Sequence, residues 1–275
     1  SLGVRLPSEE ERPLAVEPFQ LEGLPRYHVR EWLLDGIAER LAPGELRELL
    51  RGDGQLPSGS LGDFLARREQ DITARHLAAR RARMEGAEDV EVDLEVAGLR
   101  IAGVLTGFNR EEAMVVDYRL GRLRSRDRLA LGLRQLIATA VNGSSVAEFI
   151  SDGELFRLEA GEGTAWAKCE LERYVGLYRS ARERALPFFT EAGWQFVKHA
   201  AKGIEQGRRA ARMEWLGTRP GRTGLDPWRE SQDAYHQLAF RGLDPLNEEF
   251  EQLSVSLLSG IAERASERPL KGESS

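Results

Sequence analysis

Apolar residues recur at helical spacing in the first part of the chain. In the stretch that begins at Pro25, four of them lie four residues apart and so share one face of a helix: Val29, Leu33, Ile37 and Leu41. Pro43 suits the first turn of a second, shorter helix, because that turn needs no hydrogen bond from the proline nitrogen. A turn-rich break of Gly, Pro and Ser follows. The pattern then predicts a long helix over about 61–83, dense in Arg, Glu and Gln.

The period of the pattern changes near residue 88. The segment DVEVDLEVAGLRIAGVL alternates apolar and polar residues, which predicts a β-hairpin that turns at Ala97-Gly98. The segment AMVVDY predicts a third strand. In the hairpin, Glu91 and Asp93 alternate with valine and leucine, so we expect both carboxylates on the solvent face of the sheet.

A helix is expected next, over 125–141, with Ser125 as its N-cap. Its apolar face consists of Leu129, Leu133, Leu136 and Ala140. Two short strands follow on either side of Asp152-Gly153. From Thr164 onward the pattern predicts helices to the end of the chain, apart from a Gly/Pro-rich loop at 219–228.

This order of elements is typical of an α/β core. An antiparallel meander leads into a crossover helix and a further strand, and helices are added on both sides. The expected segments are an extended lead-in (1–24), a helical segment packed on the core (25–87), the α/β core (88–160), a helical C-terminal segment (161–268) and a frayed tail (269–275).

The composition limits the class of protein. Of the 275 residues 41% are hydrophobic, which suffices for a substantial core, and no run of 18 apolar residues predicts a membrane span. The opening residues carry no secretory signal, and the single cysteine, Cys169, fits a reducing cytosol, so we expect a cytoplasmic protein. The net charge is -6, yet the 39 basic residues include four lysines and therefore 35 arginines. A GC-rich genome is the simpler explanation of this excess, and composition alone does not establish nucleic-acid binding.

Asp117 and Arg119 raise the question of a nuclease site. Metal-dependent nucleases place an acid-x-Lys pair at the end of a strand, where the acid binds a divalent cation and the lysine orients the attacking water. Here arginine holds the lysine place, and Thr106 ends the preceding strand where a second carboxylate is needed. Arginine keeps its proton and a hydroxyl carries no charge, so this is a poor metal site. Three interpretations stay open: an acid paired with a nearby arginine, the remnant of a metal site, or a working site completed by another carboxylate.

Three segments carry a resemblance to a known family: FQLEGLPRYHVREWLLDGI (19–37), LRELLRGDGQLPSGSLGDFL (46–65) and VEVDLEVAGLRIAGVLTGF (90–108). They resemble the carboxy-terminal part of RecC, the gamma subunit of the helicase–nuclease exodeoxyribonuclease V (RecBCD). Residues 226–261 are similar to the ending of that family. The order and spacing of these segments carry the resemblance, since no single motif is diagnostic. It implies a restriction-endonuclease-like core of the PD-(D/E)XK type, a β-meander plus a crossover helix, without the catalytic residues.

Residue by residue, the resemblance implies a decayed active site. Asp63 stands where the active relatives have histidine, Thr106 where they have the first aspartate, and Arg119 where they have lysine. Asp117 and Gln135 match the relatives' motifs. We therefore expect these five positions to be vestigial and the chain to hold no catalytic residue. We also expect no metal site, with Asp117 as the only candidate ligand.

DNA approaches the end of the corresponding strand in the active relatives. The resemblance therefore makes the arginines that follow this strand the best candidates for contacting DNA phosphates: Arg119, Arg122, Arg124, Arg126 and Arg128. A solvated start of a helix is the alternative. A second basic group is interleaved with Met213 and Trp215, which more often pack a helix than stack on bases: Arg208, Arg209, Arg212, Arg219 and Arg222. A third group, on the long helix, is expected to be solvated or to contact a partner: Arg67, Arg68, Arg75, Arg80, Arg81 and Arg83.

The resemblance implies a non-catalytic scaffold that guides DNA in a helicase–nuclease for double-strand-break repair. Its partners would be RecB-like and RecD-like subunits and DNA bound through phosphates, without a membrane. It implies no cofactor in this chain, because the partner subunits of the complex use Mg²⁺ and ATP, and no activity of the isolated chain. The rival interpretation is a divalent-metal-dependent DNA exonuclease with a rearranged site around Asp117. A third, an adaptor unrelated to DNA, gains support if internal ion pairs occupy all the arginines of 119–128.

Overall fold

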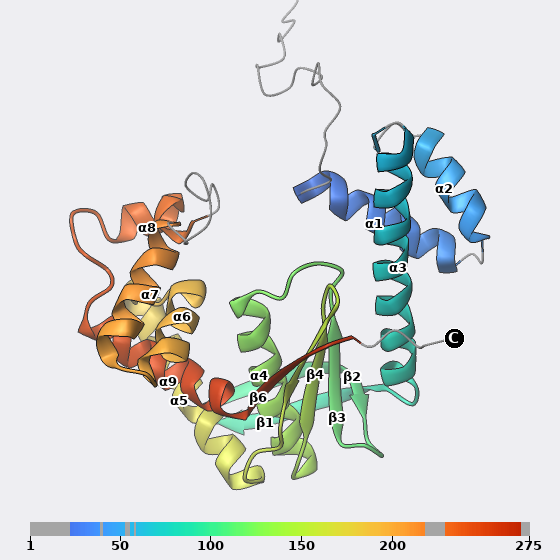
Figure 1. The fold of residues 1–275 in the computed structure, drawn as a ribbon. Coiled ribbons are helices and arrows are strands. Elements are labelled where there is room, and N and C mark those ends of the chain that lie inside the picture. Colours follow the sequence, from blue (N-terminus) through green and yellow to red (C-terminus); the bar gives the residue numbers. More distant parts are fainter. Residues whose placement is uncertain (1–22, 39–40, 53–55, 58, 218–228, 271–275) are drawn as a thin grey trace, which may run out of the picture. The chain divides into compact units, whose positions relative to one another are not determined.

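The computed structural model describes residues 23–38, 41–52, 56, 57, 59–217 and 229–270 (Figure 1). The chain divides into two compact units. The first comprises residues 1–78 and 271–275, and the second comprises residues 79–270. Most of the expected lead-in, the loop at 219–228 and the end of the expected tail lie outside the described residues.

The first unit contains α1 (Gly23–Ala38), α2 (Pro43–Gly52) and α3 (Gly59–Met84) as far as Ala78. Its apolar core consists of Val29, Leu33, Leu46, Leu50, Leu56, Leu65 and Ala66. The helical spacing of Val29 and Leu33 thus predicted a buried face that the structure confirms. Beside this core lies a buried ion pair between the Arg30 guanidinium and the Glu69 carboxylate.

The second unit is built on a six-stranded mixed sheet in the strand order β1-β2-β3-β4-β5-β6. The strands are β1 (Glu88–Val96), β2 (Leu99–Asn109), β3 (Met114–Tyr118), β4 (Val146–Ile150), β5 (Glu154–Leu158) and β6 (Ala265–Pro269). All neighbours are antiparallel except β3 and β4, which are parallel. A parallel pair needs a crossover connection, and α4 (Ser125–Asn142) supplies it. The predicted α/β class, with its meander and crossover helix, is confirmed at this level.

The hairpin of β1 and β2 turns where the sequence predicted. Ala97 and Gly98 both have positive φ angles, of 49° and 70°, as the favoured two-residue hairpin turn requires. Glu91 and Asp93 are exposed, and Asp93 accepts hydrogen bonds from the Arg100 guanidinium on the neighbouring strand. Their predicted solvent position is confirmed.

Helices cover one face of the sheet and extend beyond it: α5 (Thr164–Glu183), α6 (Thr190–Ala200), α7 (Ile204–Leu216), α8 (Ala234–Ala239) and α9 (Glu248–Arg264). The main core joins this face to α4, α6 and α9 through residues such as Val115, Phe149, Leu131 and Leu258. A second cluster packs α5 against α4 and β1. The apolar spacing of the last helix was confirmed as core packing: Phe250, Leu253, Leu257 and Leu258 are buried.

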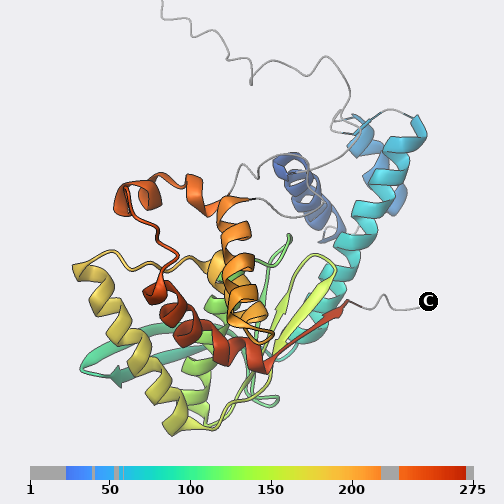
Figure 2. The same ribbon diagram turned by 60° about the vertical axis from the view of Figure 1, so that its left-hand side comes forward.

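The prediction of helix to the end of the chain was wrong after Arg264. Figure 2 shows α9 leading directly into β6 (Ala265–Pro269), which pairs with β5 at the edge of the sheet. The segment ASERP has no strand pattern of its own; the free edge of β5 supplies the backbone partners. Proline ends the strand where an edge position tolerates it. The expected frayed tail is also corrected at its start, since Pro269 belongs to β6 and Leu270 is buried.

The expected N-cap of α4 was also wrong. Arg124 occupies the cap position, and its backbone N–H donates to the Asp127 carboxylate. Ser125 is the first helical residue and is fully buried. Its N–H and hydroxyl both donate to Glu191, on the first turn of α6, at 2.9 and 2.7 Å. Asp127 therefore supplies the local cap, and Ser125 makes a tertiary contact between the starts of α4 and α6.

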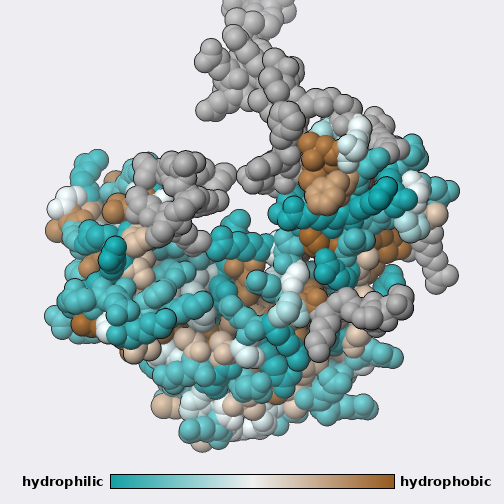
Figure 3. All heavy atoms as spheres, viewed as in Figure 1, coloured by the Kyte–Doolittle hydropathy of each residue, from teal (hydrophilic) through white to brown (hydrophobic). Residues whose placement is uncertain are grey.

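The surface of the described residues is predominantly hydrophilic in the view of Figure 3, with small apolar patches between the polar side chains. Within the described ranges, no helix has the length and apolar character that crossing a membrane requires.

Candidate functional site

Thr106 and Asp117 lie on neighbouring strands. The antiparallel pairing of β2 with β3 joins Phe108 to Val115 and Asn109 to Met114, so Thr106 and Asp117 lie two residues beyond the Phe108–Val115 pair. The strands approach closely between these points. A Cβ added to Gly107 would lie 2.6 Å from the Val116 carbonyl oxygen. The structure thus brings together the two positions that the sequence proposed for metal ligands.

A β-bulge shapes this end of β2. The pairing of β1 with β2 shifts by one residue between Val90 and Glu88, and Gly107 adopts a φ of +66°. An extra residue with positive φ is the geometry of a glycine bulge, which re-aims the neighbouring side chain. The bulge explains why Thr106, otherwise in line with the solvent-facing residues of β2, contacts a side chain of α4.

That side chain is Arg134. Its Nη2 donates to the carbonyl oxygen of Thr106 and to the Thr106 hydroxyl oxygen, the latter at 3.2 Å. Its Nη1 lies 3.7 Å from Oδ2 of Asp117, and the other Asp117 oxygen accepts the N–H of Tyr118 at 2.8 Å. A guanidinium from the crossover helix therefore supplies the positive charge between the two strands. Arg134 was not among the residues that the sequence singled out.

Arg119 does not join Asp117. Its guanidinium donates to the Asp127 carboxylate at 2.9 Å and to the backbone oxygen of Arg122, which ties the chain after β3 to the start of α4. Partial burial lowers the pKa of Arg119, and Asp127 opposes that shift. The residue in the lysine position is thus a structural link between two elements.

Gln135 has a different role, and Asp63 belongs to a different compact unit. Gln135 is fully buried, and its amide donates to the carbonyl oxygens of Ser145, Leu158 and Glu159, at 3.0, 3.3 and 2.9 Å. These hydrogen bonds link α4 to the residue before β4 and to the end of β5. Asp63 belongs to α3 in the first compact unit, whereas Asp117 belongs to the second.

The arginines proposed for DNA contact fall into two groups. Arg119 and Arg128 are engaged inside the molecule: the Arg128 side chain is only 12% exposed, pairs with Glu267 at 2.7 Å, and lies over the ring of Trp194. Arg122, Arg124 and Arg126 are exposed, and Arg126 makes only a long contact of 3.9 Å with Asp127. Internal ion pairs therefore do not occupy the whole cluster.

The family model described as the RecC C-terminal domain matches residues 1–201. The chain belongs to the RecC C-terminal domain family. It is also similar to the RecBCD enzyme subunit RecC of Escherichia coli (strain K12), at 28% identity over 204 residues. That alignment covers 72% of this chain and 17% of the relative, so the chain spans less than a fifth of that relative's length.

In this member of the RecC C-terminal domain family, the residues around Asp117 do not suit a divalent cation. Magnesium and manganese prefer several oxygen ligands, carboxylates among them. Here one carboxylate and one hydroxyl are present, and the Arg134 guanidinium already contacts both. A cation beside it would meet electrostatic repulsion. No group of three His, Cys, Asp or Glu side chains placed to hold a metal occurs in the described part of the chain.

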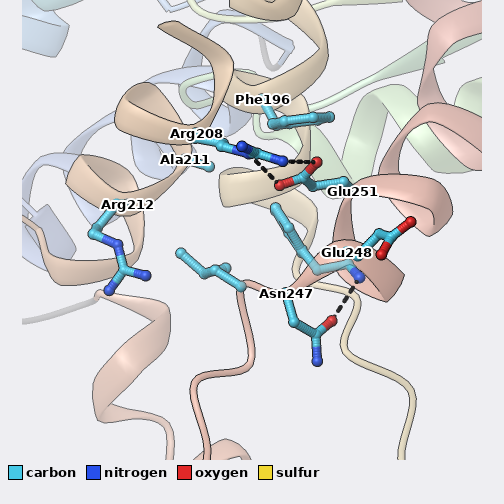
Figure 4. A pocket seen from close by; sticks show the side chains of 9 residues that line it. Phe196, Arg208, Ala211, Arg212, Asn247, Glu248 and Glu251 are labelled. Atoms are coloured by element: carbon cyan, nitrogen blue, oxygen red, sulfur yellow. Dashed lines mark hydrogen bonds and ion pairs between the residues drawn. The ribbon is translucent and has the colours of Figure 1, made fainter. Parts of the chain in front are cut away.

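Two arginines of the second basic group are paired with carboxylates within this RecC-type domain, and a third, Arg209, is exposed. Figure 4 shows the Arg208 guanidinium against the Glu251 carboxylate, at the wall of a cavity of about 310 Å³ between α6, α7 and the start of α9. Arg208 also donates to Glu205, and Arg212 pairs with Asp244. Arg219 and Arg222 lie outside the described residues.

The aromatic residue of this second group packs internally. The ring centroid of Trp215 lies 4.3 Å from that of Phe189 and 5.8 Å from that of His236. The interpretation of Trp215 as part of a packed helix face is confirmed, and this ring is not free to stack on a base.

Arg134 and Glu148 are the functional candidates that sequence reasoning missed in this RecC C-terminal domain. Arg134 lies on α4 and Glu148 on β4, whose apolar spacing was predicted. That spacing identifies the helix or strand, but it does not predict which other element a charged side chain on it will contact. Glu148 carried one weak signal: a carboxylate within the otherwise apolar run VAEFI. Such a residue is buried only when cations are available nearby.

Proposed function

We propose that this chain is a non-catalytic, nuclease-like α/β domain of an exonuclease V gamma subunit. In this proposal its sheet and crossover helix are a restriction-endonuclease-like core whose metal site has been lost. The domain works in the cytoplasm as a scaffold and DNA-guiding module of a helicase–nuclease for double-strand-break repair. Its partners are RecB-like and RecD-like subunits, which use Mg²⁺ and ATP.

One observation carries the non-catalytic part of the proposal. The guanidinium of Arg134 contacts Thr106 and Asp117, the two positions from which a nuclease of this kind would hold its metal. An arginine keeps its proton, so it neither activates a water molecule nor leaves the carboxylate free to bind a cation. Family membership supports the assignment to a RecBCD-type enzyme.

The DNA-guiding part rests on the exposed arginines Arg122, Arg124 and Arg126 at the start of α4. Phosphate contacts from such side chains orient a strand without reading its sequence. Contact with partner subunits is supported by large apolar side chains that are exposed at α8 and in the turn after it: Tyr235, Leu238 and Leu243.

The catalytic question is tested with the variant Asp117→Ala. We expect the chain to degrade neither single- nor double-stranded labelled DNA in Mg²⁺ or Mn²⁺, and calorimetry to detect no metal binding that depends on Asp117. In the assembled three-subunit complex, exonuclease activity should be the same with and without the substitution. Asp93→Ala, which removes an exposed carboxylate from β1, is the matched control. Metal binding and degradation that disappear only in Asp117→Ala would establish the rival metal-dependent exonuclease.

The DNA-guiding role is tested with a triple variant in which Arg122, Arg124 and Arg126 become serine. Each lost phosphate contact reduces the slope of log affinity against log salt by about 0.9 on duplex DNA, so a reduction of up to about 3 is expected. The matched control replaces three exposed arginines of α3: Arg67, Arg68 and Arg75. Equal effects of the two triple variants would contradict a specific role of the α4 arginines.

A further inference from the structure

The buried carboxylate of Glu148 contacts three guanidinium groups on the face of the sheet opposite α4. Glu148 lies on β4, and 3% of its side chain is exposed. It accepts hydrogen bonds from Nε of Arg83 on α3, at 2.6 Å, and from Nη1 of Arg157 on β5, at 2.9 Å. Nη2 of Arg268, on β6, lies 3.6 Å from it. Residues separated by most of the chain thus meet at one carboxylate, and we name Arg83, Arg157 and Arg268 the Glu148 arginine cluster.

The positive charge on this face exceeds what the buried carboxylate needs. Arg157 also donates to Glu159, at 2.9 Å, and Arg80 lies over the ring of Tyr118 with 3.9 Å between its guanidinium carbon and the ring centroid. The guanidiniums of Arg83, Arg157 and Arg268 therefore lie around one buried carboxylate, and Arg157 also contacts a second one, that of Glu159. Of the α3 arginines, which were expected to be solvated or to contact a partner, Arg80 and Arg83 contact the sheet instead.

The cluster keeps hydrogen-bond donors available to solvent. Arg268 is 58% exposed, and its contact with Glu148 is too long for a hydrogen bond, so most of the five N–H donors of its guanidinium are available. Arg83 and Arg157 are partly exposed. The buried apolar side chains of Ile150, Leu155 and Leu270 pack on the same face. Apolar surroundings lower the local dielectric constant and strengthen the attraction of an anion.

The geometry of the cluster suits a chain of phosphates. Arg157 and Arg268 stand on neighbouring strands, which lie about 4.8 Å apart, and Arg83 comes from a helix, so three separate elements fix the positions of the charges. The guanidinium fork matches the oxygens of phosphate and binds it without regard to base sequence.

We propose that the Glu148 arginine cluster binds the phosphodiester backbone of a DNA strand. Glu148 acts as a positioning residue that holds the guanidiniums together, and Arg268 is the most exposed contact. The choice of DNA as the phosphodiester rests on the proposed function. The site itself is separate from the arginines at the start of α4.

The first test measures the affinity of the full chain for labelled oligonucleotides against salt, with separate single-stranded and duplex arms. Arg268→Gln should weaken binding about three- to tenfold at low salt and reduce the salt slope by about 1. Arg268→Lys keeps the charge and should retain most of the affinity. Arg182→Gln, which removes an exposed arginine of α5, is the matched control and should change little. Equal affinities for Arg268→Gln and the control, in both arms, would overturn the proposal.

A second variant separates DNA binding from a purely structural ion network. Glu148→Gln removes the negative charge at the centre of the cluster but keeps one side-chain oxygen that can accept hydrogen bonds from the guanidiniums. The arginines then stay in place with less neutralisation, so the variant should bind DNA severalfold more tightly even where its melting temperature falls. A structural network alone would lower the melting temperature and leave the affinity unchanged, which counts against the proposal. Arg268→Gln tests the proposal by itself if Glu148→Gln does not fold, because Arg268 is exposed and its contact is long.

Comparison with the triple variant of Arg122, Arg124 and Arg126 separates this inference from the proposed function. Weaker binding in Arg268→Gln alone would support the Glu148 cluster and count against the α4 arginines. Weaker binding in the triple variant alone would overturn the cluster and leave the proposed function standing. No DNA binding by the unaltered chain at low salt would overturn both.

Discussion

The guanidinium of Arg134 on α4 lies 3.7 Å from a carboxylate oxygen of Asp117 on β3. The same guanidinium hydrogen-bonds to Thr106 on β2, so one side chain of the crossover helix joins two strands of the sheet. In a metal-dependent nuclease a divalent cation would stand between such strands. Here the guanidinium of Arg134 occupies that place and links α4 to β2 and β3.

Replacing Arg134 with methionine should lower the free energy of unfolding by about 1–2 kcal/mol, because a partly exposed ion pair and hydrogen bonds to Thr106 are both lost. Urea unfolding followed by circular dichroism measures this. A double-mutant cycle with Asp117→Asn should give a coupling energy of about 0.5–1 kcal/mol. Strictly additive effects of the two substitutions would contradict a direct interaction.

Glu69→Gln should destabilise the first unit by about 3–5 kcal/mol, since it removes a buried carboxylate charge that pairs with both Arg30 and Arg26. Hydrogen exchange of the backbone amides of α1 and α3 resolves this unit from the rest of the chain. Asp71→Asn, at an exposed position of the same helix, is the matched control. Unchanged protection in Glu69→Gln would show that the ion pair contributes nothing to this unit.

Glu230 should make stability depend on pH near neutrality. It accepts hydrogen bonds from the N–H groups of Glu191 and Ala192 at the start of α6. Burial raises the pKa of Glu230 from 4.5 to about 7; the two backbone N–H groups and His236 oppose this, and the Glu191 carboxylate adds to it. The folded state then binds more protons than the unfolded state between about pH 4.5 and 7, so the free energy of unfolding falls as pH rises through that window.

The decrease attributable to Glu230 should reach at most roughly 3 kcal/mol and should level off above pH 7. Glu230→Gln removes this titration, so its stability should vary less between pH 5 and pH 8 than that of the unaltered chain. Urea midpoints at several pH values provide the comparison, with Glu172→Gln on the exposed face of α5 as control. Identical pH profiles for Glu230→Gln and the unaltered chain would contradict the raised pKa.

Gln135→Leu should cost about 2–4 kcal/mol, because three carbonyl oxygens lose the buried amide that donates to them, two of them in fully buried hydrogen bonds. The carbonyls belong to Ser145, Leu158 and Glu159, so the loss should also reduce amide protection in β4 and β5. Gln252→Leu, at an exposed position of α9, should change stability by less than about 0.5 kcal/mol. A small effect at Gln135 would show that its amide is replaceable in the fold.

The periodic elements of this protein could be predicted from local sequence alone. Helical spacing at Val29 and Leu33, strand alternation in β1 and the Ala97-Gly98 turn each express a preference that acts over a few residues. The same local patterns predicted Asp117 near the end of β3 and Glu91 on the solvent face of β1. Resemblance to RecC, carried by the order of segments, correctly indicated the family.

Elements without a pattern of their own could not be predicted in this way. The segment ASERP became a strand only because β5 offered it an unpaired edge. Ser125 lies inside the first turn of α4 instead of capping it, and its N–H and hydroxyl donate to Glu191, 66 residues away. In both places a partner distant in the chain outweighs the local preference.

For the candidate site, too, some properties follow from the local sequence and others only from contacts between distant segments. The sequence by itself determined that Thr106, Asp117 and Arg119 are a poor set of metal ligands, because residue type fixes charge and protonation. Only the tertiary structure decided that Arg134 meets Asp117, that Arg119 turns to Asp127, and that three arginines converge on Glu148. Charged side chains are placed by the packing of whole elements, and the partner of each is set by contacts between segments that lie far apart in sequence.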